Sequence, residues 1–293
     1  MNNAETIPSV IVFASSSFGL RALETLIAHD DGKVNVVGIV STPDAPQGRG
    51  QVLAPNIVTT YAREHGIPVV TPESLRTEAG LNEVKNLGGD IYLVAGFGKI
   101  IPRSVIDLPK YGTLNIHPSM LPKYRGPSPI QSMILANEPE TGVTIMQLDE
   151  EMDHGPIVKQ ETCTPPDWPL PSAEAELFFA EKGAELFLAL LNDWMTGTLK
   201  AQEQDHHMTT FTHKFSKADA EIKSDMNEAH KYRTFCTFHE HPGAYFFDGE
   251  NRIKVVEANF IDEKFMPVMV VPAGKKLMTY ESYVNGKHGS KKA

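Results

Sequence analysis

Two polar side chains that could act in catalysis stand two residues apart in a short apolar segment. The segment reads "GTLNIH" at residues 112–117 and contains Asn115 and His117, with Pro118 immediately after it. A β-strand alternates its side chains between two faces, so both residues are expected on the same face. An amide can donate a hydrogen bond to a developing oxyanion, and an imidazole can exchange a proton. The alternative is a structural histidine, hydrogen-bonded at the end of a strand.

A carboxylate that could complete this pair follows in the segment "EMDHGPI", where Asp153 precedes His154 and Gly155. A carboxylate close to an imidazole favours the charged form of the ring and fixes its orientation. No serine or cysteine stands in a nucleophile motif, because "SSSFG" at residues 15–19 differs from G-x-S-x-G. The attacking group would then belong to a substrate. "SSSFG" also departs from G-x-G-x-x-G, which makes a dinucleotide site improbable.

Alternating apolar strands and helices predict the elements that position these residues. The strands run almost without polar interruption, which is typical of a parallel sheet covered by helices on both faces. We therefore predict an α/β fold with a doubly wound, mostly parallel sheet. Strands are expected at residues 10–14, 33–42, 67–70, 90–97, 112–117, 142–149 and 156–163, and helices at 18–30, 56–66, 128–137 and 172–194.

Ligands of open parallel sheets bind beyond the carboxyl ends of the strands. Asn115 and His117 occupy one such end. Residues 96–99 follow the strand before it, and residues 149–153 follow the strand after it. We therefore expect three strand ends to converge on one crevice.

Composition places the chain among globular proteins with a hydrophobic core. Of its 293 residues, 41% are hydrophobic, and no apolar run approaches the length of a membrane span. No secretory signal is visible, and two cysteines without a CxxC pair fit a reducing, cytoplasmic setting. No set of residues suggests a metal site. A net charge of -10 argues against broad nucleic-acid binding.

The pattern of elements changes after residue 195, and the charge changes near the same place. Short strands separated by turns such as Asp248-Gly249 follow, so we predict domains at 1–195 and 210–293 with a linker at 196–209. Residues 206–293 hold 13 Lys and Arg against 11 Asp and Glu, whereas residues 1–205 hold 14 against 26. Such asymmetry marks either a partner-binding half or a solvated basic surface.

The segments "NIHPSMLPKYRGPSPIQ" and "ETGVTIMQLDEEMDHGPI" resemble the folate-dependent formyltransferases, and among them the members that act on methionyl-tRNA. "TPDAPQGRGQVLAPNIV", "VAGFGKIIP" and "PAGKKLMTYESYVNG" extend the resemblance over nearly the whole chain. It implies a Rossmann-like catalytic domain and a small, OB-like C-terminal β-barrel. The implied activity transfers a formyl group from 10-formyltetrahydrofolate to the α-amine of methionyl-tRNA, with Asn115, His117 and Asp153 as catalytic residues.

The resemblance also implies binding residues. For folate these are Phe97, Gly98, Lys99, Ile100, Ile101, Ser119, Met120, Leu121, Pro122 and Asp149. For tRNA they are Arg49, Lys123, Arg125, Lys275, Lys276 and Lys287, several of which could equally belong to a solvated face. No metal is implied, and we expect a monomer that does not bind membranes.

Four features depart from the family pattern. Ser15 to Ser17 replace a Gly-Thr-Pro-type turn, and residues 51–53 are Gln-Val-Leu where lysines are common. His154 replaces a small residue, and the C-terminal domain is expected to be shorter than in the family. Three alternatives stay open at this point. They are a formyltransferase for amino-sugar nucleotides, a hydrolase that releases formate from the same folate, and a non-catalytic RNA-binding protein.

Overall fold

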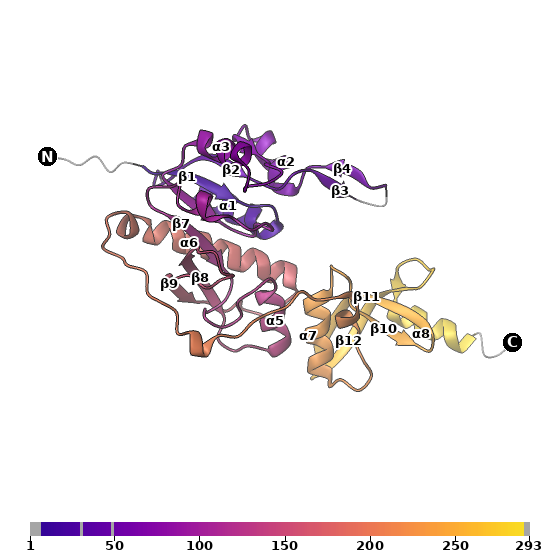
Figure 1. Cartoon of the computed structure of the whole chain (residues 1–293). Coiled ribbons are helices and arrows are strands. Elements are labelled where there is room, and N and C mark those ends of the chain that lie inside the picture. The colour runs from indigo at the N-terminus through magenta and orange to yellow at the C-terminus, as the bar shows by residue number, and fades with distance from the viewer. Residues whose placement is uncertain (1–6, 30–31, 48–49, 290–293) are drawn as a thin grey trace. The chain divides into compact units, whose positions relative to one another are not determined.

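The computed structural model describes residues 7–29, 32–47 and 50–289, with the side chains of residues 287–289 excepted (Figure 1). The chain forms two compact units. The first consists of residues 1–126, 140–163 and 176–211, and the second of residues 127–139, 164–175 and 212–293. In the described part of the chain, no helix is both long and apolar enough to cross a membrane.

A seven-stranded sheet forms the centre of the first unit, with strand order β5-β2-β1-β6-β7-β8-β9. The strands from β5 to β7 are parallel, and β8 and β9 are antiparallel to their neighbours. This confirms the predicted α/β fold with a mostly parallel sheet. The strands are β1 (Ser9–Phe13), β2 (Asn35–Val40), β5 (Val69–Val70), β6 (Ile91–Val94), β7 (Thr113–His117), β8 (Gly142–Gln147) and β9 (Ile157–Thr162).

The antiparallel direction of β8 corrects one expectation. Leu114 near the start of β7 pairs with Gln147 at the end of β8, so the carboxyl ends of these two strands lie at opposite edges of the sheet. The expected convergence of three strand ends is therefore wrong for residues 149–153 as a group. Within that loop, the structure separates Asp149 from Asp153, as described below.

Helices of the first unit begin where side chains satisfy free backbone N–H groups. Ser16, Asn56 and Thr77 accept hydrogen bonds from the first turns of α1, α2 and α3. The sequence analysis did not predict α3 or α4. The helices are α1 (Ser17–Ala28), α2 (Ile57–Glu64), α3 (Glu78–Leu87), α4 (Arg103–Ile106) and α6 (Ser172–Met195), of which residues 176–195 belong to this unit.

The long helix α6 packs closely against the strand that carries Asn115 and His117. A Cβ atom on Gly183 would lie 2.2 Å from Cγ2 of Ile116, so only glycine allows this approach. Ile116 is 2% exposed and projects from β7 between the two polar residues. Since alternate side chains of a strand point to opposite faces, α6 covers the face opposite Asn115 and His117.

A β-hairpin that the sequence analysis did not predict lies between β2 and α2. β3 (Ala45–Gln47) pairs antiparallel with β4 (Val52–Ala54), and Gln47 donates side-chain hydrogen bonds to the carbonyls of Ala54 and Pro55. Val52 and Leu53 are each 68% exposed.

The second unit contains the predicted small β domain. Its four-stranded antiparallel sheet has the order β10-β11-β12-β13, and Asp248 pairs with Asn251 across a turn in which Gly249 has φ 62°. The predicted strands are confirmed, whereas α7 and α8 were not predicted. The elements are α5 (Pro129–Ala136), α7 (Glu228–Phe238), β10 (Tyr245–Asp248), β11 (Asn251–Ile261), β12 (Lys264–Pro272), β13 (Met278–Thr279) and α8 (Tyr280–Gly289).

Candidate active site

The two polar residues of β7 are buried in the middle of the sheet. Asn115 is 9% exposed and His117 is 4% exposed, and the backbone of Asn115 pairs with Val94 on one side and Met146 on the other. A central strand normally carries apolar side chains at such positions. Burying an amide and an imidazole there costs free energy unless partners or ligands compensate for it.

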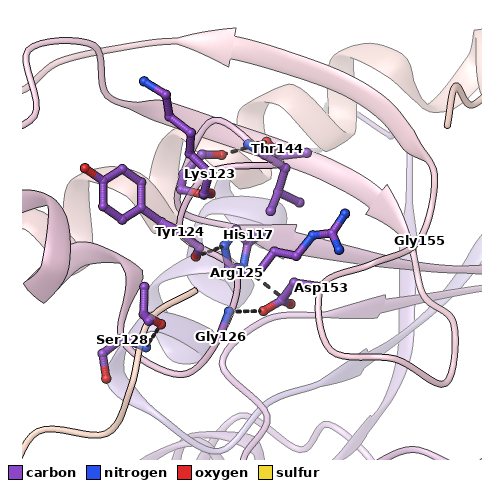
Figure 2. A network of polar contacts seen from close by, with 12 residues as sticks. His117, Lys123, Tyr124, Arg125, Gly126, Ser128, Thr144, Asp153 and Gly155 are labelled. Carbon is purple, nitrogen blue, oxygen red and sulfur yellow. Dashed lines mark hydrogen bonds and ion pairs between the residues drawn. The ribbon is translucent and has the colours of Figure 1, made fainter. Parts of the chain in front are cut away.

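His117 has an oxygen atom near each of its ring nitrogens (Figure 2). Nε2 lies 3.0 Å from the backbone carbonyl of Tyr124, and Nδ1 lies 3.5 Å from Oδ1 of Asp153. A carbonyl only accepts hydrogen bonds, so Nε2 carries a proton. Nδ1 is therefore the ring nitrogen that can gain or lose a proton, and it faces the carboxylate.

Asp153 is held in place by backbone groups. Its Oδ2 accepts a hydrogen bond of 2.7 Å from the N–H of Gly126, and its own φ of 53° lies in the left-handed region that Asp tolerates better than most residues. A Cβ atom on Gly155 would lie 2.1 Å from the carbonyl oxygen of Gln147. The Asp-x-Gly pattern thus has a physical basis, because the glycine lets the loop approach β8.

The Asn115 side chain makes no hydrogen bond with the residues that the structure describes. Its position in β7 places it on the same face of the strand as His117. A buried amide donor without a protein partner suits a site that binds an oxygen atom of a substrate.

The segment 96–101 follows β6 at the same edge of the sheet as His117. Ser15 replaces the family's turn residue and holds this segment, since its Oγ donates to the carbonyl of Gly96 and accepts from the N–H of Gly98, each at 3.3 Å. Gly96 has φ 57°, and a Cβ atom there would lie 2.2 Å from Oγ of Ser16. The serine turn therefore keeps the segment ordered.

Residues predicted to bind folate in this segment point in different directions. Phe97 packs edge-on against Phe13, Ile101 is 6% exposed in the core, and Lys99 donates to the carbonyls of Pro72 and Glu73. Ile100 is 72% exposed. The exposed Ile100 and the exposed backbone of Gly98 fit a ligand that needs an apolar contact and backbone hydrogen bonds.

The segment 119–122 is a packed turn. Ser119 is fully buried and donates to the carbonyl of Lys123, while its own carbonyl accepts from Thr144. Leu121 is 3% exposed and its carbonyl accepts from Gln160. Met120 is half-buried beside Gly142, and the Leu121-Pro122 peptide is cis. These side chains shape the turn that leads to Tyr124, so a ligand would meet mainly their backbone.

Asp149 lies apart from the other predicted site residues. It accepts a hydrogen bond of 2.7 Å from Nδ1 of His154, and it lines a cavity of about 560 Å³ together with Thr113 and Trp194. Thr113 is the first residue of β7, whereas His117 is the last. Asn115, His117 and Asp153 do not line this cavity.

The residues predicted to contact tRNA occupy different environments. Arg49 and the side chain of Lys287 lie outside the described residues. Lys275 and Lys276 are exposed in the turn after β12, and Lys123 is half-buried with its side chain directed away from Asp153 (Figure 2). Arg125 is 3% exposed and binds Gln204, an environment that does not suit a phosphate contact.

Sequence reasoning missed the groups that anchor His117 and Asp153. These are the carbonyl of Tyr124 and the N–H of Gly126, both of which follow Pro122. Tyr124 has φ 61° and Gly126 has φ 117°, so the "YRG" segment is an irregular turn. The glycine was the one available signal, because backbone groups are invisible to an analysis of side-chain types.

Neither cysteine is suited to act as a nucleophile. Burial raises the pKa of the Cys163 thiol to about 11, with Glu161 adding to the effect, and burial raises the pKa of the Cys236 thiol to about 12. Both thiols are therefore protonated at neutral pH. This agrees with an attacking group that belongs to a substrate.

A doubly wound sheet with a polar site at its carboxyl edge defines a class of α/β enzymes. Comparison with known proteins identifies the family within that class. Residues 9–165 match the formyl transferase family. A methionyl-tRNA formyltransferase from Roseiflexus sp. (strain RS-1) is 38% identical over 260 residues, which cover 88% of this chain and 79% of that relative. The protein belongs to the formyl transferase family.

Solved structures share the fold at low sequence identity. The methionyl-tRNA formyltransferase from Clostridium thermocellum superposes with a TM-score of 0.62 at 16% identity, covering 92% of this chain and 98% of that one. An N-formyltransferase from Helicobacter canadensis, in complex with folinic acid and dTDP-3-aminofucose, has a TM-score of 0.59 at 19% identity, covering 94% and 99%. At these identities the likeness concerns the fold alone.

Proposed function

We propose that the protein transfers a formyl group from 10-formyltetrahydrofolate to the α-amino group of methionyl-tRNA, as used in translation initiation. The observation that carries this proposal is the relative of that name, which is 38% identical over 88% of the chain. A folate donor is supported by the family and by the folinic acid bound to the neighbour from Helicobacter canadensis. Among the predicted folate residues, we retain residues 97–101 and the 119–122 turn as the folate site, and we keep Asp149 as a separate candidate in the cavity beside Thr113.

The site geometry supports a specific division of labour. The substrate amine attacks the formyl carbon, and negative charge develops on the formyl oxygen. Asn115 donates to this oxygen from the same strand face as His117, and one such donor is worth roughly 3 kcal/mol. The Nδ1 of His117 lies 3.5 Å from Oδ1 of Asp153, and we assign to it the proton that the amine loses.

Asp153 stabilises the proton that His117 takes from the amine. Its carboxylate faces Nδ1 while its other oxygen is held by Gly126, so it stabilises the imidazolium that forms without leaving its place. Bond-making and proton transfer thus need no nucleophile from the protein. The formyl group passes to the amine as its bond to N10 of the folate breaks. The His117–Asp153 pair then returns the amine's proton to N10, so that tetrahydrofolate leaves and the pair regains its starting state.

The test is formyl transfer by the purified protein with 10-formyltetrahydrofolate and methionyl-tRNA. Asn115→Ala and His117→Ala should each lower kcat by about 100-fold or more, with circular dichroism spectra unchanged. The same assay is run with a dTDP-amino sugar as the acceptor. Formylation of the sugar nucleotide, with none of methionyl-tRNA, would contradict the proposed acceptor. Formate release without any acceptor would indicate a hydrolase.

We propose that the β3–β4 hairpin and the second unit bind the tRNA. The hairpin displays Val52 and Leu53 to solvent, and Arg49 comes between its two strands in the sequence. Lys275, Lys276 and Lys287 would contact phosphates, and we retain Lys123 as a weaker candidate. Arg49→Ala should raise KM for methionyl-tRNA at least tenfold while leaving the Kd of folate nearly unchanged. Equal loss of both would contradict the assignment.

The protein should act in the cytoplasm as a monomer that binds no metal. The two free cysteines agree with a reducing compartment. Sedimentation equilibrium of the full chain, without and with tRNA, checks the oligomeric state. A dimer in both conditions would contradict it.

A further inference from the structure

Gln204, in the segment that follows α6, binds three backbone and side-chain partners at once. Its Nε2 donates to the carbonyls of Asp153 and Gly155 at 3.0 and 2.8 Å. Its Oε1 accepts from Nε and Nη2 of Arg125 at 3.1 and 2.6 Å. Gln204 is 4% exposed and Arg125 is 3% exposed, so neither interacts freely with water.

The orientation of this amide follows from its partners. Carbonyl oxygens only accept hydrogen bonds and a guanidinium only donates them, so Nε2 must face the two carbonyls and Oε1 must face Arg125. Both N–H groups and both lone pairs of the amide are then used. A buried and fully satisfied side chain of this kind fixes the groups that it joins.

Gln204 joins the two loops that hold His117. One loop contains Tyr124, whose carbonyl accepts from Nε2 of His117, and Gly126, whose N–H donates to Asp153. The other contains Asp153 itself. Tyr124 and Asp153 both have left-handed backbone conformations, with φ values of 61° and 53°, which are unfavourable for L-residues. Such conformations persist only where neighbouring contacts hold them.

We propose that Gln204 is a positioning residue for catalysis. It sets the distance between Asp153 and His117 by linking the backbone of the 153–155 loop to the buried side chain of Arg125, which belongs to the turn that holds His117. The proposal rests on the proposed function, since it requires His117 and Asp153 to be the catalytic pair. Gln204 touches neither substrate. Its effect should appear in kcat, because it moves a proton-accepting group, and hardly in the binding of either substrate.

The deciding variant is Gln204→Glu. A glutamate has the same size and still accepts from Arg125, but it places an oxygen where two carbonyls need a donor, so the 153–155 loop must shift. We expect kcat to fall by about 10- to 100-fold, as for other small displacements of catalytic groups. The KM values for 10-formyltetrahydrofolate and methionyl-tRNA should stay within about twofold, since binding contacts are retained.

Thr141→Val is the matched control. It removes the hydrogen bond from Oγ1 of the fully buried Thr141 to the carbonyl of Cys163, 2.7 Å long and outside the segments that contain His117 and Asp153. The control should retain wild-type kcat even if its melting temperature falls. Should Gln204→Glu fail to fold, Arg125→Lys tests the same clamp, because lysine keeps the charge but loses the two-point contact. It should lower kcat with unchanged KM.

The outcomes separate this proposal from the proposed function. Gln204→Glu with wild-type kcat, beside an inactive Asp153→Ala, overturns the clamp and leaves the proposed function standing. A rise in KM with kcat unchanged also overturns the clamp, since it would assign Gln204 to binding. An active Asp153→Ala removes the catalytic role of Asp153 and with it the clamp, while the formyl transfer itself still stands. A wild-type protein that does not formylate methionyl-tRNA overturns the proposed function.

Discussion

The first unit contains two histidine–aspartate pairs that consist of the same residue types and differ in structure. In each, Nδ1 of the histidine faces an aspartate from the loop after β8. His154 lies 2.7 Å from Asp149, with side chains 30% and 27% exposed. His117 lies 3.5 Å from Asp153, with side chains 5% and 15% exposed.

The difference lies in what holds each pair. The second nitrogen of His117 donates to the carbonyl of Tyr124, and Asp153 accepts from the backbone of Gly126. The ring of His154 instead stacks on the exposed ring of His206, with centroids 4.5 Å apart. The closer pair is the more solvated one, and exposed ion pairs stabilise proteins by about 1 kcal/mol at most. Burial and backbone anchoring therefore decide which pair can do chemistry, and a short distance does not.

The largest expected effect separates the two aspartates. Asp153→Ala should lower kcat by about 100- to 10,000-fold, because His117 loses the group that stabilises its charged form. Asp149→Ala should raise KM for the folate and lower kcat less than about tenfold. Steady-state kinetics on both variants measure this. Similar losses of kcat would remove the distinction between the pairs.

Gly155→Ala tests the anchoring of Asp153 without changing the carboxylate. The added Cβ atom would lie 2.1 Å from the carbonyl of Gln147, so the loop must move. We expect a loss of about 1–3 kcal/mol in the free energy of unfolding and a lower kcat. Gly286→Ala in α8 is the control. Among the described residues, and apart from its chain neighbours and the backbone of its own helix, no atom lies within 4 Å of the added Cβ, so kcat should not change. Urea melts and kinetics measure both, and a fully active Gly155→Ala would contradict the role of the loop.

His154→Thr removes the solvated pair and introduces a smaller side chain. The free energy of unfolding should fall by less than about 1 kcal/mol. Because salt screens exposed charges, this loss should be smaller still at roughly 0.5 M salt. The value of kcat should change less than about threefold. A large loss of kcat would mean that the stacked histidines contribute to the reaction, which would make the two pairs one site.

Alkylation of the thiols should have the smallest effect on activity. Because burial raises the pKa of Cys163 to about 11, its thiolate fraction at pH 8 is lower by roughly 100-fold than that of an unperturbed thiol. Iodoacetamide should therefore modify the folded protein slowly, and the rate should rise with pH. Mass spectrometry and activity follow the reaction. Fast inactivation at pH 8 would reveal a thiol in the chemistry that the His117–Asp153 pair is proposed to perform alone.

Much of the fold was predictable because its signals are local. Apolar runs with β-branched residues marked the strands of the first unit, and Asn115 with His117 marked the site by being polar in such a run. Helix α3 was missed although Leu81, Val84 and Leu87 stand at helical spacing, whereas the short strands of the β3–β4 hairpin have no apolar alternation to mark them. The reversal at β8 was missed because strand direction depends on how the chain returns to the sheet.

The sequence by itself determined the residue types that the chemistry needs and the glycine that lets the Asp153 loop approach β8, because periodicity and side-chain chemistry are properties of short segments. Only the tertiary structure decided that Asp153 and not Asp149 reaches His117, that Arg125 is buried against Gln204, and that the carbonyl of Tyr124 fixes the imidazole. These outcomes depend on backbone groups and left-handed turns, which are set by packing between segments far apart in the chain.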